Sequence, residues 1–127
     1  MNEHTVLIVD DDDDIRMLAA DAIAANGYDV ITAASASEAL TLLAEGAEPI
    51  LVVTDLQMPG MDGDELCLRM RTLLGQGDLQ VVLMSADVDG HARAVACGAD
   101  QFLAKPIDEP RLLRALCASI SCAPRCA

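Results

Sequence analysis

The chain has 127 residues, of which 53% are hydrophobic, and this suits one globular domain with one buried core. Acidic residues outnumber basic ones by 21 to 8, and the formal net charge of −13 would repel a phosphate backbone, so we expect a protein partner or a metal cation and no direct nucleic-acid binding. No apolar run reaches the roughly 18 residues of a membrane span, and the first residues lack the features of a signal peptide, so we expect a cytoplasmic protein without membrane association.

Short apolar segments rich in β-branched residues alternate with amphipathic segments, which predicts alternating strands and helices. Ser35 and Glu38 have the spacing of a capping box, and Gly27, Gly46 and Gly98 stand where helices are expected to end. In chain order the predicted elements are a strand at Thr5–Val9, a helix at Asp14–Ala25, a strand at Tyr28–Thr32, a helix from Ser35 to about Glu45, a strand at Ile50–Thr54, a helix from Asp62 to about Leu74, a strand at Gln80–Met84, a short helix at Asp89–Cys97, a strand at Gln101–Ala104 and a helix from Asp108 to about Ile120.

Five strand–helix units in a short chain predict an α/β fold with helices on both faces of a parallel sheet. Right-handed connections and coverage of both faces favour a doubly wound five-stranded sheet in the order 2-1-3-4-5, with five helices. We expect one domain over residues 1–121 and a short C-terminal tail over residues 122–127.

Polar side chains follow four of the five predicted strands. Asp10 and Asp11 come directly after the first strand, Asp55 ends the third, Ser85 ends the fourth and Lys105 follows the fifth. Ligands of open parallel sheets bind beyond the carboxyl ends of the strands. We therefore expect three carboxylates, a hydroxyl and an ammonium group to converge on one edge of the sheet.

The chemistry of this set points to phosphoryl transfer. Clustered carboxylates repel one another and require a cation, and hard oxygen ligands favour Mg²⁺, with Mn²⁺ as an alternative. A carboxylate such as Asp55 can attack phosphorus and form an acyl phosphate. Lys105 and the metal would neutralise charge on the phosphoryl group, and Ser85 could donate a hydrogen bond to it.

Four segments resemble the receiver domain of two-component response regulators, a CheY-like, flavodoxin-like fold: VLIVDD at 6–11, TDLQMPGMDG at 54–63, MSA at 84–86 and FLAKP at 102–106. The resemblance runs from about His4 to Ile120, and the order and spacing of the four segments are highly specific. It implies a signalling phosphoacceptor that catalyses only its own phosphorylation and dephosphorylation, not an enzyme acting on other substrates.

The resemblance also implies roles for individual residues. Asp55 would be the phosphoacceptor and would bind the metal together with Asp10, Asp11 and the main-chain carbonyl of Gln57. Ser85 would be the switch hydroxyl. Lys105 would be the phosphate-binding lysine, and Phe102 would occupy the aromatic switch position.

Two residues are expected to tune dephosphorylation, because in the family the corresponding positions influence the attacking water: Gln57 and Asp87. The bond between Lys105 and Pro106 is expected to be cis, as in the family. Phe102 has no hydroxyl, so any switch through its ring would act by packing.

The implied phosphoryl donor is a histidine kinase or a histidine phosphotransfer protein, and the implied output is a downstream protein target. The signal would leave through the face built from the fourth helix, fifth strand and fifth helix, unless the phosphoryl group is passed on. The alternative is a haloacid-dehalogenase-type phosphatase, which is disfavoured because such enzymes need an acid where this chain has Gln57. A stand-alone regulator and a piece of a longer regulator or hybrid kinase both remain open.

The five cysteines are odd in number and lack the close pairs of zinc sites, so we expect neither a disulfide framework nor a zinc site. Cys67 and Cys97 lie in apolar helical stretches and are expected to pack as small hydrophobic residues. Cys122 and Cys126 lie in the tail and are expected to be exposed. His91 is expected to be exposed and to have no metal-binding role.

Overall fold

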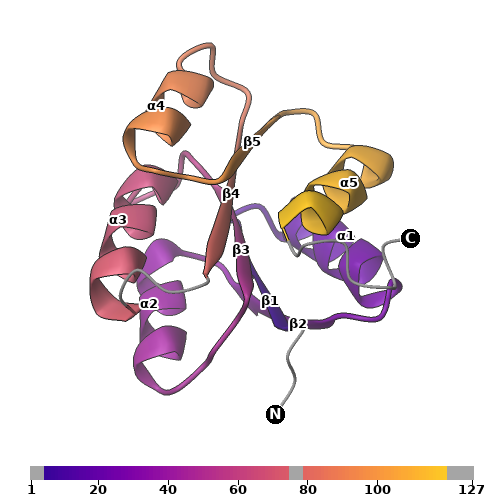
Figure 1. Cartoon of the computed structure of the whole chain (residues 1–127), viewed down its shortest axis with the longest axis horizontal. Helices are drawn as coiled ribbons and strands as arrows, with labels where there is room; N and C mark the ends of the chain where they lie inside the picture. Colours follow the sequence, from indigo (N-terminus) through magenta and orange to yellow (C-terminus); the bar gives the residue numbers. More distant parts are fainter. Residues whose placement is uncertain (1–4, 75–78, 120–127) are drawn as a thin grey trace.

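A computed structural model describes residues 5–74 and 79–119 of the chain. Its strands form one parallel five-stranded sheet in the order β2-β1-β3-β4-β5, as predicted (Figure 1). The elements in chain order are β1 (Thr5–Val9), α1 (Asp13–Ala24), β2 (Asp29–Ala33), α2 (Ala36–Ala44), β3 (Leu51–Asp55), α3 (Gly63–Leu74), β4 (Gln80–Ser85), α4 (Gly90–Ala96), β5 (Gln101–Ala104) and α5 (Glu109–Ser119).

Helices cover both faces of the sheet, with α1 and α5 on one face and α2, α3 and α4 on the other (Figure 1). Successive side chains of β1 point to opposite faces, as the pleat of a strand requires. Val6 and Ile8 belong to the core cluster under α1 and α5. Leu7 and Val9 belong to the cluster under α2, α3 and α4. Two apolar layers therefore hold the strands in place and fix the positions of the loops at their ends.

Most predicted boundaries agree with the structure to within one residue. The second strand begins at Asp29, not Tyr28, because pairing with β1 begins at Thr5 and Asp29 while the Tyr28 side chain is buried in the core. The third strand extends to Asp55, because that residue still pairs with Met84 of β4. The predicted end of the last helix at Ile120 and the tail at 122–127 lie outside the described residues.

Side-chain caps explain where two helices begin. The Asp12 carboxylate accepts hydrogen bonds from the N–H groups of Asp14 and Ile15, so the first helix starts at Asp13. Ser35 Oγ accepts from the Glu38 N–H at 3.1 Å, as a capping box predicts, but the Glu38 carboxylate accepts from Ala34 rather than from Ser35. The acidic run after β1 therefore contributes to local structure as well as to charge.

Cys67 and Cys97 are buried and carry free thiols, which confirms the prediction that they pack in the core. Burial and, to a lesser extent, the neighbouring Cys97 raise the pKa of the Cys67 thiol to about 11. The protonated thiol is therefore the stable form at neutral pH, where it is a weak nucleophile. Cys122 and Cys126 lie outside the described residues.

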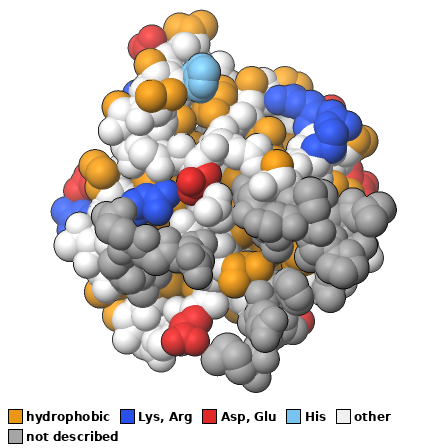
Figure 2. Space-filling model, in the orientation of Figure 1, with side chains coloured by type: hydrophobic (Ala, Val, Ile, Leu, Met, Phe, Trp, Pro, Cys, Tyr) orange, Lys and Arg blue, Asp and Glu red, His pale blue; other side chains and the backbone are white. Residues whose placement is uncertain are grey.

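Among the described residues, no helix is both long and apolar enough to cross a membrane. Figure 2 shows one face of the molecule, where hydrophobic and charged side chains are interspersed outside the grey residues. Basic side chains gather in this view at the upper right and at the left, although the formal charge of the whole chain is −13.

Candidate functional site

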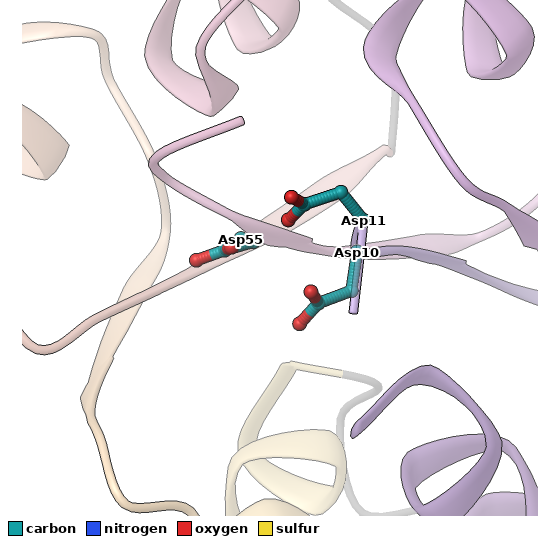
Figure 3. Close-up of side chains that lie close together, drawn as sticks. All are labelled: Asp10, Asp11 and Asp55. Atoms are coloured by element: carbon teal, nitrogen blue, oxygen red, sulfur yellow. The ribbon is translucent and has the colours of Figure 1, made fainter. Parts of the chain in front are cut away.

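Three carboxylates meet at the carboxyl ends of β1 and β3. Asp10 and Asp11 follow β1, and Asp55 is the last residue of β3. One oxygen from each carboxylate lies within 4.8 Å of the others. Figure 3 shows the three side chains gathered at this edge of the sheet. The predicted convergence of residues far apart in sequence is thus present in the fold, because β1 and β3 are hydrogen-bonded neighbours.

Asp10 is fully buried, and only one of its two carboxylate oxygens has a hydrogen-bond partner. Oδ1 accepts a hydrogen bond from the backbone N–H of Asp12 at 2.9 Å. Oδ2 has no hydrogen-bond partner, and the nearest cation, Lys105 Nζ, lies 3.7 Å away. Burial raises the pKa of Asp10, and the Asp12 hydrogen bond only partly opposes this. A buried carboxylate oxygen without a partner is costly, and a bound cation would relieve that cost.

Asp55 is nearly as buried, with 6% of its surface exposed, and is paired with Lys105. Lys105 Nζ lies 3.0 Å from Asp55 Oδ1. Burial raises the pKa of Asp55, while the hydrogen bond from Lys105 and its positive charge lower it. The lysine follows β5 in a loop with a cis bond between Lys105 and Pro106, as predicted. Lys105 therefore reaches Asp55 across β4, which lies between β3 and β5 in the sheet.

Ser85 lies on β4, the strand between β3, which carries Asp55, and β5, which carries Phe102. It ends β4, is 1% exposed, and its Oγ accepts a hydrogen bond from the backbone N–H of Asp87 at 2.9 Å. A Cβ added to Gly90 would lie 2.9 Å from Ser85 Cβ and 2.8 Å from Phe102 Cε1. The Phe102 ring thus occupies space that Gly90 leaves free, close to the predicted switch hydroxyl.

His91 has a contact that the sequence did not indicate. Its ring stacks on the Phe102 ring, with centroids 5.6 Å apart and an interplanar angle of 29°. The prediction that His91 is exposed is confirmed. The sequence periodicity could not place it on Phe102, because His91 lies in α4 and Phe102 in β5.

Gln57 and Asp87 meet at the rim of the site. Gln57 Nε2 donates a hydrogen bond to Asp87 Oδ2 at 2.5 Å, although 30 residues separate them. Both side chains are exposed. The two positions that the sequence singled out separately therefore form one pair, which links the loop after β3 to the loop after β4.

Two arginines hold loops of the site without touching Asp55, and sequence reasoning missed both. Arg16 Nη1 donates to the main-chain carbonyl of Asp10 at 2.9 Å. Arg111 donates to the carbonyls of Ala104 and Pro106, both at 3.0 Å, on either side of Lys105. Helical spacing shows which face an arginine occupies but not which carbonyl it reaches, so the sequence holds no signal for these contacts.

The donor set fits a hard divalent cation. The cluster offers carboxylate oxygens alone, which Mg²⁺ prefers, and Asp10 Oδ2 is buried and unpaired. Lys105 supplies a single positive charge against three carboxylates. The main-chain carbonyl of Gln57 stays a predicted ligand.

Comparison with known proteins agrees with this geometry. Residues 6–117 match the family model of the response regulator receiver domain. The chain is similar to the chemotaxis response regulator CheY4 of Vibrio cholerae, with 28% identity, a TM-score of 0.83, and coverage of 93% of this chain and 99% of that one.

Two relatives in sequence differ in length. A probable transcriptional regulator, ycf27 of Porphyridium aerugineum, is 34% identical over 114 residues, which cover 88% of this chain and 46% of the relative. An uncharacterized 14.6 kDa protein of Leptolyngbya boryana is 39% identical over 111 residues, which cover 86% of this chain and 84% of the relative. The chain thus spans about half the length of the transcriptional regulators that it matches.

Proposed function

The chain belongs to the response regulator receiver domain family, and from this premise we propose that Asp55 accepts a phosphoryl group in a Mg²⁺-dependent reaction. The observation that carries the proposal is the position of Asp55. It ends a buried strand, lies within 4.8 Å of two other carboxylates and is 3.0 Å from Lys105. A nucleophilic carboxylate needs this combination of a fixed position and nearby positive charge.

The proposed step is an attack by a carboxylate oxygen of Asp55 on phosphorus. With a phosphohistidine donor, an O–P bond forms on Asp55 while the N–P bond breaks, and the leaving imidazole takes up a proton. Lys105 stays close to the developing negative charge, because Arg111 holds the carbonyls on both sides of it. Ser85 would donate its hydroxyl hydrogen to a phosphoryl oxygen and so sense the modification.

Asp10, Asp11 and Asp55 would hold the metal ion, with Mg²⁺ as the expected ion and Mn²⁺ as the alternative. The bound ion would neutralise charge on the phosphoryl group. The protein's own contribution is to keep Asp10 fixed, through the Asp12 N–H on its side chain and Arg16 on its carbonyl.

We propose that the signal passes from Ser85 to Phe102 and so to the face built from α4, β5 and α5. The Phe102 ring already touches the space beside Ser85 over Gly90. A movement of the Ser85 hydroxyl toward a phosphoryl group would allow this ring to turn and would break its stack with His91. If that face did not respond, the domain would serve as a carrier that passes the phosphoryl group on.

The partners follow from the family. The proposed donor is a histidine kinase or a histidine phosphotransfer protein, and the proposed receiver of the signal is a downstream protein target. We also propose that the domain occupies residues 1–121, followed by the tail 122–127, and that it works in the cytoplasm without direct contact to nucleic acid.

A haloacid-dehalogenase-type phosphatase would require a proton-transferring acid at position 57. The residue there is Gln57, an amide, and its side chain donates a hydrogen bond to Asp87. An amide does not transfer protons, so Gln57 cannot serve as the general acid of that reaction. The comparisons give this alternative no support.

Incubation with acetyl phosphate and Mg²⁺ tests the proposal. We expect the intact mass to rise by one phosphoryl group, which hydroxylamine removes as it removes acyl phosphates. Asp55→Asn should abolish the labelling, because an amide is not a nucleophile toward phosphorus. Asp21→Asn, an exposed carboxylate on α1, is the matched control and should be labelled like the wild type. Labelling that persists in Asp55→Asn at another single site would identify a different phosphoacceptor.

A further inference from the structure

An arginine of α4 is bound to two acids at the start of α3. Arg93 donates from Nε and Nη2 to the two oxygens of Asp64, both at 3.0 Å. Its Nη2 also donates to Asp62 Oδ2 at 3.0 Å. The hydrogen bonds to Asp64 and, to a lesser extent, the bond to Asp62 raise the pKa of Arg93, so the guanidinium stays charged. A two-bond arginine–carboxylate contact of this kind fixes direction as well as distance.

Asp62 is also bound to the loop that follows Asp55. Its Oδ1 accepts a hydrogen bond from the backbone N–H of Met58 at 3.2 Å. Its main-chain carbonyl accepts from the N–H of Leu66 in the first turn of α3. Asp62 therefore joins three parts of the molecule: Arg93 of α4, the loop after β3, and α3.

Gly63, the residue after Asp62, lies directly against the backbone of the phosphoacceptor. The N–H of Gly63 donates to the carbonyl of Leu56 at 2.6 Å. A Cβ on Gly63 would lie 2.2 Å from the Asp55 carbonyl oxygen, a distance that real Cβ atoms do not show. Because close-packed atoms transmit displacement, a shift of Asp62 would reach the backbone of Asp55.

The length, the N-cap and the buried side chains of α4 contribute little to its stability. It has seven residues, and Asp89 at its N-cap makes no side-chain capping hydrogen bond. Helices this short depend on tertiary contacts for their stability. The buried residues within it, Gly90 and Ala94, have little or no side chain to pack. The ion pairs of Arg93 therefore join α4 to α3 on this face of the sheet (Figure 1), beside the stack of His91 on Phe102 and the hydrogen bond from the Cys67 thiol to the Cys97 carbonyl.

We propose that Arg93 is a positioning residue that holds α4 in its ligand-free place and couples α4 displacement to the loop after Asp55. The inference rests on the proposed function, in which α4 responds to phosphorylation. Contacts made in one of two states shift the equilibrium between those states. Loss of the Arg93 contacts thus favours the displaced state, and by reciprocity the site then binds a phosphoryl mimic more tightly.

A titration of the full chain with beryllofluoride and Mg²⁺, followed by backbone NMR, measures this coupling. Arg93→Gln should raise the apparent affinity for the mimic by about fivefold, the lower end of coupling between sites. In the ligand-free variant, amide signals of 90–96 should move toward their mimic-bound positions. Asp64→Asn should act in the same direction, because it removes the negative charge and one of the two acceptor oxygens and leaves the contact between Asp62 and Met58 in place.

Arg69→Gln is the matched control. It removes the same charge and breaks the exposed pair between Arg69 and Glu65 within α3, and it leaves the hydrogen bonds of Arg93 to Asp62 and Asp64 in place. The mimic affinity of this control should stay within about twofold of the wild type, as expected for an exposed pair. An affinity of Arg93→Gln that is equal to or below that of the control overturns the proposal.

Failure of the proposed function can be told apart from failure of this inference. A wild type that binds no mimic contradicts the proposed function. Amide hydrogen exchange of 90–96 in the ligand-free chains then still tests the role of Arg93. Faster exchange in Arg93→Gln but not in Arg69→Gln supports the restraint on α4, and equal exchange in all three chains overturns it.

Discussion

Lys105 is the only lysine in the chain, and it lies beside two of the three clustered carboxylates. One ammonium group cannot offset the repulsion and burial of three carboxylates, which is why the pKa values of both Asp10 and Asp55 are raised by burial despite its presence. At the residue scale, three ionised carboxylates and one ammonium group give the site a net charge of −2, which one divalent cation would neutralise.

The pair formed by Gln57 and Asp87 leads to a prediction about phosphoryl lifetime. Gln57→Ala and Asp87→Ala should each change the rate of dephosphorylation, because the family resemblance implies that both positions influence the attacking water, and both side chains are exposed. Since one hydrogen bond of 2.5 Å joins them, the double variant should depart from the sum of the single effects by about 0.5 kcal/mol or more. The measurement is the decay of labelled protein after the phosphoryl donor is removed.

A pair of residues without mutual contact serves as the control for this double-mutant comparison. Gln57→Ala combined with Arg69→Gln should be additive, because those side chains share no contact with each other in the described structure. The initial labelling of Asp55 should be unchanged in all variants. Additive effects of Gln57→Ala and Asp87→Ala would show that the hydrogen bond between them does not govern the water.

At the element scale, the sequence alone predicted the strand order of the sheet and the polar residues at its strand ends. The strands are short, continuous and rich in β-branched residues, and a predicted site residue ends or follows four of the five, at places that the strand order brings together. The sequence was not sufficient for contacts between elements. The bonds of Arg93 to Asp62 and Asp64 and the stack of His91 on Phe102 depend on how α4 is rotated and tilted, which a helical pattern of seven residues does not determine.

Gly90 offers a test of the link between α4 and β5. In Gly90→Ala the new Cβ would lie 2.8 and 2.9 Å from atoms of the Phe102 ring and 2.9 Å from Ser85 Cβ. Because Ser85 is part of a buried strand, the ring is the group that must turn away. We expect the changes that beryllofluoride causes in the NMR signals of β5 and α5 to shrink, while Asp55 is still labelled by acetyl phosphate.

Gly90→Ala also raises the helix propensity of α4 by about 1 kcal/mol. Ala92→Gly alters propensity by a similar amount in the opposite sense, at an exposed position, and should leave the Phe102 ring signals in place. Ser85→Ala should reproduce the loss of response at β5 and α5 without moving the ring in the ligand-free chain. A response in Gly90→Ala equal to that of the wild type would remove Phe102 from the proposed signal route.

At the scale of the whole molecule, arginines secure the loops at the carboxyl end of the sheet from both sides. Arg16 of α1 and Arg111 of α5 hold main-chain carbonyls of the first and last loops. Arg93 of α4 holds the side chains of Asp62, just before α3, and of Asp64 in its first turn. Arg16 and Arg111 therefore fix main-chain atoms of loops, whereas Arg93 joins one helix to another. In the proposed function α4 is the element that moves, so Arg93 is the arginine whose contacts would change.

Mg²⁺ should stabilise the entire domain, because a ligand that binds only the folded chain raises the free energy of unfolding by mass action. At 100 times its dissociation constant the gain is about 2.7 kcal/mol, and at roughly 4 °C per kcal/mol the Tm should rise by roughly 10 °C. Asp11→Asn removes an exposed member of the cluster, so it should raise the Tm without Mg²⁺ and reduce the rise on adding it. Thermal unfolding by circular dichroism at matched ionic strength measures both effects, with Asp21→Asn as a control that should respond like the wild type. A wild-type Tm that does not change with Mg²⁺ would show that the three carboxylates do not hold the ion.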